Sequence, residues 1–285
     1  MNGQAVGIVG AGVMGSSLAQ ALVDRGIDTV LHDSDPGALR AAADRVGDGD
    51  RVTRLRRGGA PQGPKGRLEY ASSLRDLAGT RLVVENITED PAAKEKVHRA
   101  LDEVLGADTV VAVNTSAIPV TGLALETAHP GRVLGAHFMN PVALSSMVEV
   151  IRTPYTTPEA LGTLQDVAGR LGKDTVVVND VAGFVINRCL MMFVNEAAAL
   201  LDDGVATPAQ VDQLFRGCLG HRTGPLRTAD LIGLDTVALT LDVLAEHHGP
   251  ERFTPSARLR RMVQEGHLGR KSGRGFYDYH LGEPA

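Results

Sequence analysis

The sequence has no tryptophan, only two cysteines and few aromatic residues, and it lacks a strong excess of charge of either sign. Aromatic residues make up 4% of its 285 residues, and the formal net charge is -5. Cys189 and Cys218 are too few for a disulfide framework or a cysteine metal site, so we expect structural thiols, a reducing compartment and no metal. The slightly acidic balance argues against binding to nucleic acid or to a membrane surface.

Long hydrophobic runs are also missing. No stretch approaches the roughly 20 apolar residues that span a membrane. The first strand pattern begins within a few residues of Met1, without the basic and apolar regions of a secretory signal. We therefore expect a cytoplasmic protein. With 43% hydrophobic residues, the chain can build one large or two ordinary domains with a substantial core.

A glycine-rich motif follows the first expected strand. Residues 6–9 form a short apolar run, and Gly10, Gly12 and Gly15 then have the G-x-G-x-x-G spacing before an apolar helix pattern. In this context the first glycine permits a tight turn, the second lets the backbone approach a pyrophosphate, and the third allows close packing of helix on strand. The phosphates would lie at the positive N-terminus of the helix. The motif predicts a dinucleotide-binding turn.

A carboxylate ends the second expected strand, residues 29–32. Asp33 lies 18 residues after Gly15, close to the roughly 20-residue interval of a ribose-binding acid. Its side chain can accept hydrogen bonds from the adenosine ribose hydroxyls and would repel a 2′-phosphate. The motif therefore predicts NAD in preference to NADP.

The chain changes character between residues 36 and 68. Residues 38–46 have a helical pattern, whereas residues 47–67 are rich in glycine, proline and the basic residues Arg51, Arg54, Arg56, Arg57, Lys65 and Arg67. We interpret this Arg-rich segment, residues 51–67, as a solvated loop or arm. The alternative is a flap that contacts an anion, because clustered arginines suit phosphates or an acidic partner.

Two further expected strands also end in polar residues. Residues 82–85 precede Glu89 and Lys94, and residues 109–113 precede the Asn-Thr-Ser sequence at 114–116. Ligands bind at the carboxyl edge of a parallel sheet, so Glu89 and Lys94 are cofactor candidates and this sequence can present a hydroxyl to a substrate. A solvated helix face and a helix cap are the simpler explanations.

Residues 135–150 contain one histidine, one asparagine and one carboxylate. Apolar residues on both sides of Pro141 predict a strand, a turn and a second strand, which would bring His137 and Glu149 side by side. A neutral imidazole with a carboxylate on its far nitrogen is oriented and stabilised when it accepts a proton, as a general base near neutral pH requires. A core histidine and a strand-end glutamate explain these residues equally well.

The remainder of the chain looks helical. A last β-branched strand over residues 175–178 precedes a long apolar helix with Asn187 near its start. A buried asparagine needs hydrogen-bond partners, and a ligand carbonyl is one candidate. The expected fold is α/β, with a Rossmann-type, mostly parallel sheet domain over residues 1–181 and an all-helical domain over residues 182–285. The apolar helix faces of the second domain suggest self-association.

Several motifs follow one another along the chain: GAGVMG, ITEDPAAK, NTS, HFMNPV with MVEV, GFVINR, TGPLRTADLIGLD and GHLGRKSGRGFYDY. The series resembles the 3-hydroxyacyl-CoA dehydrogenase family over essentially the whole chain. The resemblance implies an NAD-dependent oxidoreductase that interconverts 3-hydroxyacyl and 3-oxoacyl thioesters. It also implies that residues 1–181 bind NAD and that residues 182–285 bind substrate and form a homodimer.

The resemblance also implies roles for individual residues. The catalytic set is His137, Glu149, Ser116 and Asn187. The substrate contacts are Ser116, Asn140 and Asn187. The cofactor-binding residues are Gly10, Gly12, Val13, Met14, Gly15, Asp33, Glu89, Lys94, Asn114 and Lys271.

Departures from the family pattern bear on the substrate. The Arg-rich segment stands where CoA enzymes of the family have a longer, Lys-rich helical arm. The sequences ENITED and GCLGHRTGPLRTADLIGLD, and Ala182 where Pro is usual, resemble a polyketide branch of the family. Members of that branch oxidise a glyceryl group on an acyl carrier protein, on the way to hydroxymalonyl or methoxymalonyl extender units. We therefore favour a glyceryl-acyl carrier protein as the substrate.

Two alternatives remain open. The first is a 3-hydroxybutyryl-CoA or other 3-hydroxyacyl-CoA dehydrogenase of fatty-acid metabolism, because the same arginines suit either an acidic carrier protein or the phosphates of CoA. The second is a non-catalytic NAD-binding structural or regulatory protein, because fold alone does not establish function. Such a protein would not need the catalytic set named above.

Overall fold

The computed structural model describes residues 5–57 and 64–280, and the side chains of residues 48–57 lie outside the described set. The chain divides into two compact units, Met1–Val181 and Ala182–Ala285, called the first and second units below. None of the helices in these described ranges is long and apolar enough to cross a membrane.

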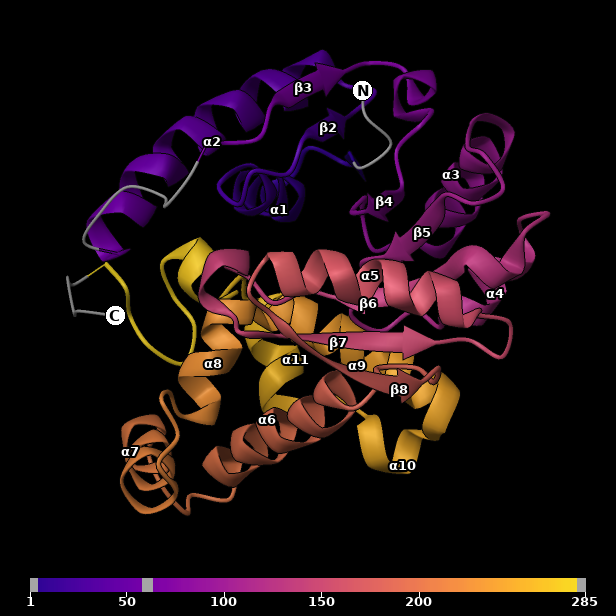
Figure 1. The fold of residues 1–285 in the computed structure, drawn as a ribbon. Helices are drawn as coiled ribbons and strands as arrows, with labels where there is room; N and C mark the ends of the chain where they lie inside the picture. The colour runs from indigo at the N-terminus through magenta and orange to yellow at the C-terminus, as the bar shows by residue number, and fades with distance from the viewer. Residues whose placement is uncertain (1–4, 58–63, 281–285) are drawn as a thin grey trace. The chain divides into compact units, whose positions relative to one another are not determined.

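Within the described residues, the first unit is built on an eight-stranded sheet of order β3-β2-β1-β4-β5-β6-β7-β8 (Figure 1). The strands are β1 (Val6–Val9), β2 (Thr29–His32), β3 (Leu68–Ala71), β4 (Leu82–Glu85), β5 (Val110–Val113), β6 (Val133–His137), β7 (Met147–Arg152) and β8 (Asp174–Asn179). All neighbours pair in parallel except β6 and β7, which are antiparallel.

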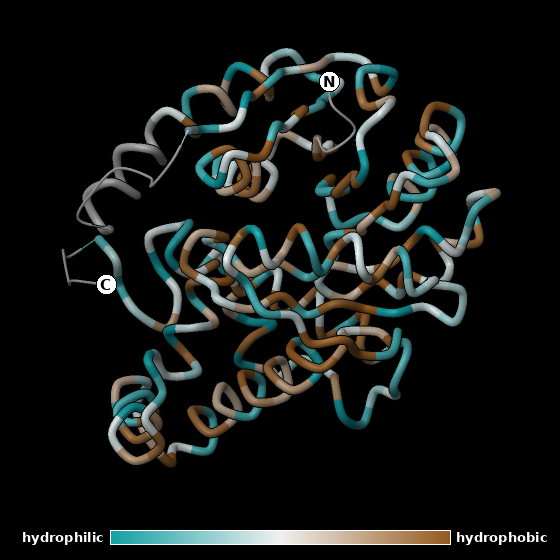
Figure 2. The backbone as a smooth tube through the Cα atoms, in the orientation of Figure 1, coloured by the Kyte–Doolittle hydropathy of each residue, from teal (hydrophilic) through white to brown (hydrophobic). Residues whose placement is uncertain are grey.

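The central strands are unbroken apolar runs because both faces of the sheet are covered. Every residue of β1, β4 and β5 is buried, and Figure 2 shows β4 and β5 as hydrophobic stretches. The chain runs from β1 to β2 and β3 on one side, then returns to β4 on the other side of β1. This reversal makes a topological switch point between β1 and β4, where open α/β sheets bind ligands.

Five helices and three 3-10 turns of the described first unit connect these strands. They are α1 (Val13–Val23), α2 (Pro36–Arg57), α3 (Pro91–Val104), α4 (Val120–Leu125), α5 (Pro158–Arg170), η1 (Leu74–Leu77), η2 (Pro130–Arg132) and η3 (Val142–Leu144). Two of these helices begin with a side-chain cap followed by proline, at Asp90 before α3 and at Thr157 before α5.

Helix α2 continues to Arg57, so the helix is longer than the pattern expected over residues 38–46, and a loop is wrong for residues 51–57 of the Arg-rich segment. Glycine in a helix costs about 1 kcal/mol but does not break it, and no proline interrupts this stretch. Residues 58–63 and the side chains of Arg51, Arg54, Arg56 and Arg57 lie outside the described residues. The two basic residues that follow pair with carboxylates, Lys65 with Asp24 at 3.2 Å and Arg67 with Asp28 at 3.1 Å.

The second unit is helical, and together with the mostly parallel sheet it confirms the predicted fold class. Its elements are α6 (Ile186–Asp202), α7 (Pro208–Leu219), α8 (Pro225–Ile232), α9 (Leu234–His248), α10 (Pro250–Phe253), α11 (Ala257–Gln264) and η4 (Arg270–Ser272). The buried Asp230 on α8 accepts hydrogen bonds from the backbone N–H groups of Phe276 and Tyr277 at 2.9 and 3.0 Å. These bonds attach the GFYDY sequence to α8.

Both cysteines belong to the second unit. Cys189 and Cys218 are free and exposed, so neither thiol is packed in the core. Cys189 lies on α6 and Cys218 on α7. Their neighbours in sequence are apolar, and this pattern does not indicate whether a residue is on the surface or in the core.

Three ionisable side chains are enclosed between β4 and α3. Glu85, Lys94 and His98 are each 0% exposed. Lys94 Nζ donates to both carboxylate oxygens of Glu85, at 2.8 and 3.0 Å, and His98 Nε2 lies 3.6 Å from Glu85 Oε2. Burial alone raises the pKa of Glu85, but the adjacent imidazole and ammonium outweigh it, so the pKa lies below its usual value. The ammonium depends on this carboxylate because an unpaired buried charge is costly.

We expect Glu85→Gln to lower the free energy of unfolding at pH 7 by about 3–5 kcal/mol, because it leaves the Lys94 ammonium enclosed without its carboxylate. The folded-state pKa of Glu85 is lowered, so the carboxylate stabilises the fold above its unfolded pKa of about 4.5. This contribution is lost as the pH falls through the folded-state pKa. Urea unfolding at pH 7 and at successively lower pH measures both effects.

Glu126→Gln is the matched control, because Glu126 pairs with Arg99 at the surface and exposed pairs contribute less than about 1 kcal/mol. Equal losses for the two variants at pH 7, or a loss for Glu85→Gln that does not shrink at low pH, would contradict the role of the buried pair.

Candidate active site

The carboxyl ends of β1, β4, β5 and β6 lie along one edge of the sheet because these strands are parallel. Hydrogen bonds join the residues that follow them. Asn86 N–H donates to Val9 O at 2.7 Å, and Asn114 N–H donates to Glu85 O at 2.8 Å. The Asn114 amide donates to Asn86 Oδ1 at 2.7 Å and accepts from Phe138 N–H at 3.1 Å. The ends of three strands are thus joined through Asn114.

The glycine-rich turn between β1 and α1 is shaped for a close backbone approach. Gly10 has φ +100°, and a Cβ there would lie 2.6 Å from Asn86 O. A Cβ on Gly15 would lie 1.9 Å from Gly10 O, whereas a Cβ on Gly12 would meet nothing within 4 Å. Gly12 begins α1 without a side-chain cap. The turn therefore has an open face at a helix N-terminus, which fits a dinucleotide pyrophosphate. Val13 and Met14 form the first turn of this helix.

Two side chains from other elements contact this turn. Asp33, at the end of β2, accepts a hydrogen bond from Ala11 N–H at 2.8 Å through Oδ2 and from Asp35 N–H at 3.0 Å through Oδ1. Arg45 on α2 donates to Ala11 O at 2.8 Å and to Ser16 Oγ at 2.9 Å. The Asp33 carboxylate is therefore fixed beside the turn, and the Arg45 guanidinium adds positive charge to it.

Glu89 organises the turn after β5. Its Oε1 accepts hydrogen bonds from Thr115 Oγ1 at 2.6 Å, from Ser116 N–H at 2.7 Å and from Ala117 N–H at 3.2 Å. The turn that carries Ser116 is thus attached to the segment after β4. Glu89 is itself exposed, so it can contact a ligand at this edge.

Lys94 occupies a different environment from the one its sequence position suggests. Its side chain is 0% exposed, and besides Glu85 it donates to Asn114 O at 3.3 Å. In this arrangement Lys94 acts on the sheet edge through the groups that it binds.

His137 and Glu149 face each other across the one antiparallel strand pair of the sheet within the described residues. They are partners in the register of β6 and β7, and His137 Nδ1 lies 3.0 Å from Glu149 Oε2. Each residue is 5% exposed. The strand, turn and strand expected around Pro141 are present, with η3 in the connection. Because Nδ1 faces the carboxylate, a proton transfer to the imidazole would use Nε2.

The remaining predicted site residues lie in several places. Asn140 is exposed on the segment between β6 and β7. Asn187 and Lys271 belong to the second unit. Asn187 is buried in the first turn of α6, and Lys271 Nζ lies 2.6 Å from Asp235. The predicted site residues of the first unit therefore follow strands that end at one edge of the sheet. Asn187 and Lys271 belong to the helical second unit.

Sequence reasoning missed three side chains that shape this edge. Glu85 could have been found, because a carboxylate that ends a fully apolar strand is unusual. The amide of Asn86 and the guanidinium of Arg45 gave no such signal, because their partners lie 28 and 34 residues away in sequence.

Two family models together match nearly the whole chain. The model described as 3-hydroxyacyl-CoA dehydrogenase, NAD binding domain, matches residues 5–181. The model described as 3-hydroxyacyl-CoA dehydrogenase, C-terminal domain, matches residues 183–279. The presence of the first domain, with a glycine-rich turn that fits a dinucleotide, establishes NAD as the cofactor.

Relatives in sequence and in structure belong to the same family. The chain is 39% identical over 280 residues to the probable 3-hydroxybutyryl-CoA dehydrogenase of Deinococcus radiodurans, covering 96% of this chain and 99% of that one. It is 38% identical over 285 residues to the 3-hydroxybutyryl-CoA dehydrogenase of Mycobacterium tuberculosis, covering 97% and 98%. The crystal structure of (S)-3-hydroxybutyryl-CoA dehydrogenase from Ralstonia eutropha matches with a TM-score of 0.90 at 35% identity, covering 97% and 99%. The chain is an NAD-dependent oxidoreductase acting on CH–OH groups, and it belongs to the 3-hydroxyacyl-CoA dehydrogenase family.

Proposed function

We propose that the protein oxidises short 3-hydroxyacyl-CoA thioesters, of the size of 3-hydroxybutyryl-CoA, to 3-oxoacyl-CoA with NAD, or catalyses the reverse reaction. The observation that carries the proposal is the enclosed His137–Glu149 pair, with 3.0 Å between Nδ1 and Oε2, on the same sheet edge as the glycine-rich turn. The names of the relatives support the substrate class, because they are 3-hydroxybutyryl-CoA dehydrogenases.

This proposal reverses the preference for a glyceryl-acyl carrier protein. The chain matches these relatives over almost their entire length, and both are named for a CoA thioester substrate. Two of the basic residues that suggested an acidic carrier protein pair within the chain, Lys65 with Asp24 and Arg67 with Asp28. The side chains of Arg51, Arg54, Arg56 and Arg57 lie outside the described residues.

The cofactor would contact the groups around the first βα turn. We assign the pyrophosphate to the open backbone at Gly12, Val13 and Met14 and the adenosine ribose to Asp33. Glu89 and Asn114 are assigned to the nicotinamide side, with Lys94 acting through Asn114 O. Lys271 is assigned as a further cofactor contact, as the family resemblance implies. When bound, NAD supplies the acceptor for the hydride that leaves C3 of the substrate.

His137 is the general base. Its Nε2 removes the proton of the 3-hydroxyl group while the C3–H bond breaks, so that the oxygen becomes a carbonyl. Glu149 accepts a hydrogen bond from Nδ1–H, which fixes the tautomer and stabilises the imidazolium that forms. The enclosed position keeps water away from the pair, so the carboxylate acts at close range in a low-dielectric environment.

The neutral polar residues orient the substrate. We assign the Ser116 hydroxyl to the 3-oxygen, where a donor stabilises the charge that develops during proton transfer. Asn140 and Asn187 would contact the thioester group or the 3-oxygen. Glu89 supports this arrangement by accepting the Ser116 N–H.

His137→Ala is expected to lower kcat by about 10²–10⁴-fold, the usual contribution of a general base. The affinity for NADH should change little, because His137 is not part of the glycine-rich turn. Steady-state kinetics and a fluorescence titration with NADH separate the two effects.

His129→Ala is the control, because the exposed His129 precedes η2 at the other end of β6. Unchanged turnover in the His137 variant would refute the assignment. A wild-type protein that binds NADH but turns over no thioester would favour a non-catalytic NAD-binding protein.

The substrate is tested by offering 3-hydroxybutyryl-CoA and a glyceryl-loaded acyl carrier protein in parallel and measuring NADH formation with the purified protein. We expect a kcat/KM for the CoA thioester at least about tenfold above that for the carrier protein, a difference of about 1.4 kcal/mol in transition-state stabilisation. A higher kcat/KM for the carrier protein would instead support a role in extender-unit synthesis.

We also assign homodimer formation to the second unit. Three apolar side chains on and beside α7 are strongly exposed, Val205 by 67%, Leu214 by 59% and Leu219 by 64%. An apolar surface of this kind is typical of an interface.

Leu214→Lys should give a monomer in sedimentation velocity at concentrations where the wild type associates. Leu125→Lys is the control, because it changes an exposed leucine of the first unit, and it should associate like the wild type. A wild-type monomer would refute the assignment.

A further inference from the structure

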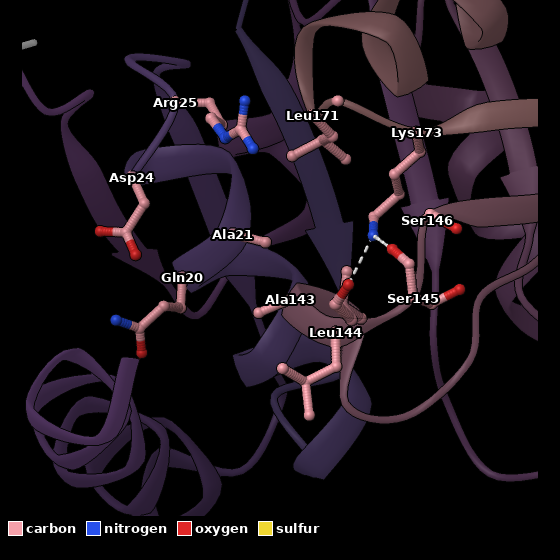
Figure 3. Close-up of a pocket in the computed structure, with 12 residues that line it drawn as sticks. Gln20, Ala21, Asp24, Arg25, Ala143, Leu144, Ser145, Ser146, Leu171 and Lys173 are labelled. Atoms are coloured by element: carbon pink, nitrogen blue, oxygen red, sulfur yellow. Dashed lines mark hydrogen bonds between the residues drawn. The ribbon is translucent and has the colours of Figure 1, made fainter. Parts of the chain in front are cut away.

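Lys173 is an enclosed cation bonded to the segment that joins the two catalytic strands. It follows the Gly172 turn after α5 and directly precedes β8, and only 8% of the residue is exposed. Its ammonium donates hydrogen bonds to the carbonyl oxygens of Val142 and Ser145 (Figure 3). Both acceptors belong to residues 138–146, called the connecting segment below, which runs from the end of β6 to the start of β7.

The connecting segment is attached on two sides. Val142 N–H donates to Ser17 Oγ on α1 at 3.2 Å. Asp174 N–H, next to Lys173, donates to Ser146 O at 2.8 Å. Lys173 adds two bonds from the β8 side, and its two acceptors lie at the start of η3 and just after it. The lysine therefore determines the path of the segment where it turns back toward the sheet.

The physical chemistry of a buried ammonium makes these bonds persistent. A charge removed from water is stable only while oriented dipoles replace its hydration. Two carbonyl groups that point at one nitrogen supply such dipoles, and they would repel each other without it. A neutral apolar side chain of the same length would fill the space but would leave both carbonyl groups unpaired.

In the sequence, the connecting segment lies between His137 and Glu149. His137 immediately precedes it, Glu149 follows three residues after its end, and Asn140 lies on it. A displacement of about 1 Å in a catalytic constellation can cost about 10²-fold in rate. We propose that Lys173 is a positioning residue, which fixes the connecting segment and through it the His137–Glu149 pair and Asn140. This inference rests on the dehydrogenase function proposed above.

The kinetic test compares Lys173→Met with Lys173→Arg. The Met variant removes the charge and the donors, and its kcat should fall about tenfold or more while KM for NAD changes less than about twofold. The Arg variant keeps a cation with several donors and should recover part of the loss. A Met variant with wild-type kcat would overturn the proposal.

Arg132→Met is the matched control. Arg132 is also an enclosed cation, 5% exposed, and its guanidinium donates to Gly106 O and to Asp102 Oδ1. It precedes β6 at the end away from His137. The control should lose stability but keep kcat within about twofold of wild type. An equal loss of kcat in both variants would assign Lys173 to general stability and overturn the positioning role.

Hydrogen exchange measured by mass spectrometry tests Lys173 without any substrate. Lys173→Met should speed exchange in peptides that cover residues 138–149, whereas Arg132→Met should not. This readout separates the two hypotheses, because it decides the role of Lys173 even if the wild type turns over no thioester. Faster exchange spread evenly over the first unit would overturn the proposal. Lys173→Gln replaces the Met variant if that variant does not fold, and failure of both to fold would likewise assign the lysine to stability.

Discussion

The proposed catalytic arrangement depends on one reversal of strand direction. Strands β1 to β6 are parallel, and β7 then pairs antiparallel with β6. Antiparallel partners lie directly opposite each other with their side chains on the same face. His137 and Glu149 are such partners, so their contact follows from the register of two strands, with the short connection between them. The parallel part of the sheet brings the glycine-rich turn and the turn of Ser116 to the same edge. The proposed chemistry needs both kinds of strand pairing. The antiparallel pair brings the base to its carboxylate, and the parallel pairs bring together the turns that would bind the cofactor.

Much of this could be predicted from sequence because the signals are local. The G-x-G-x-x-G motif, the apolar strands and the capped helices each lie within about a dozen residues, and the strand–turn–strand pattern around Pro141 placed His137 opposite Glu149. Other features depend on residues far apart in the chain. Arg45 contacts the glycine-rich turn from 34 residues away, and no local pattern distinguishes it from a solvated arginine. The local pattern predicts too short a helix α2, because Gly47 and Gly49 lie within the helix without ending it. The exposure of Cys189 and Cys218 depends on how the helices of the second unit pack, which apolar neighbours in sequence do not reveal.

The enclosed pair of Lys94 and Glu85 shows why a family resemblance alone does not give a residue its physical role. The motif assigned Lys94 to the cofactor, and its sequence position at the start of α3 is consistent with a surface side chain. The structure gives it no exposed surface and two carboxylate oxygens as partners. Its third bond, to Asn114 O, connects this buried charge to the strand end that also binds Phe138 N–H. The buried ion pair and the hydrogen bonds of Asn114 at the sheet edge are therefore parts of one network.

The carboxylate of Asp33 has a consequence for enzyme engineering. A change from NAD to NADP is normally sought by replacing the acidic residue at the end of the second strand with a small or basic one. In this protein the same carboxylate also accepts the N–H of Ala11 and the N–H of Asp35. A redesign at this position must therefore keep a hydrogen-bond acceptor for the Ala11 N–H as well as make room for the extra phosphate.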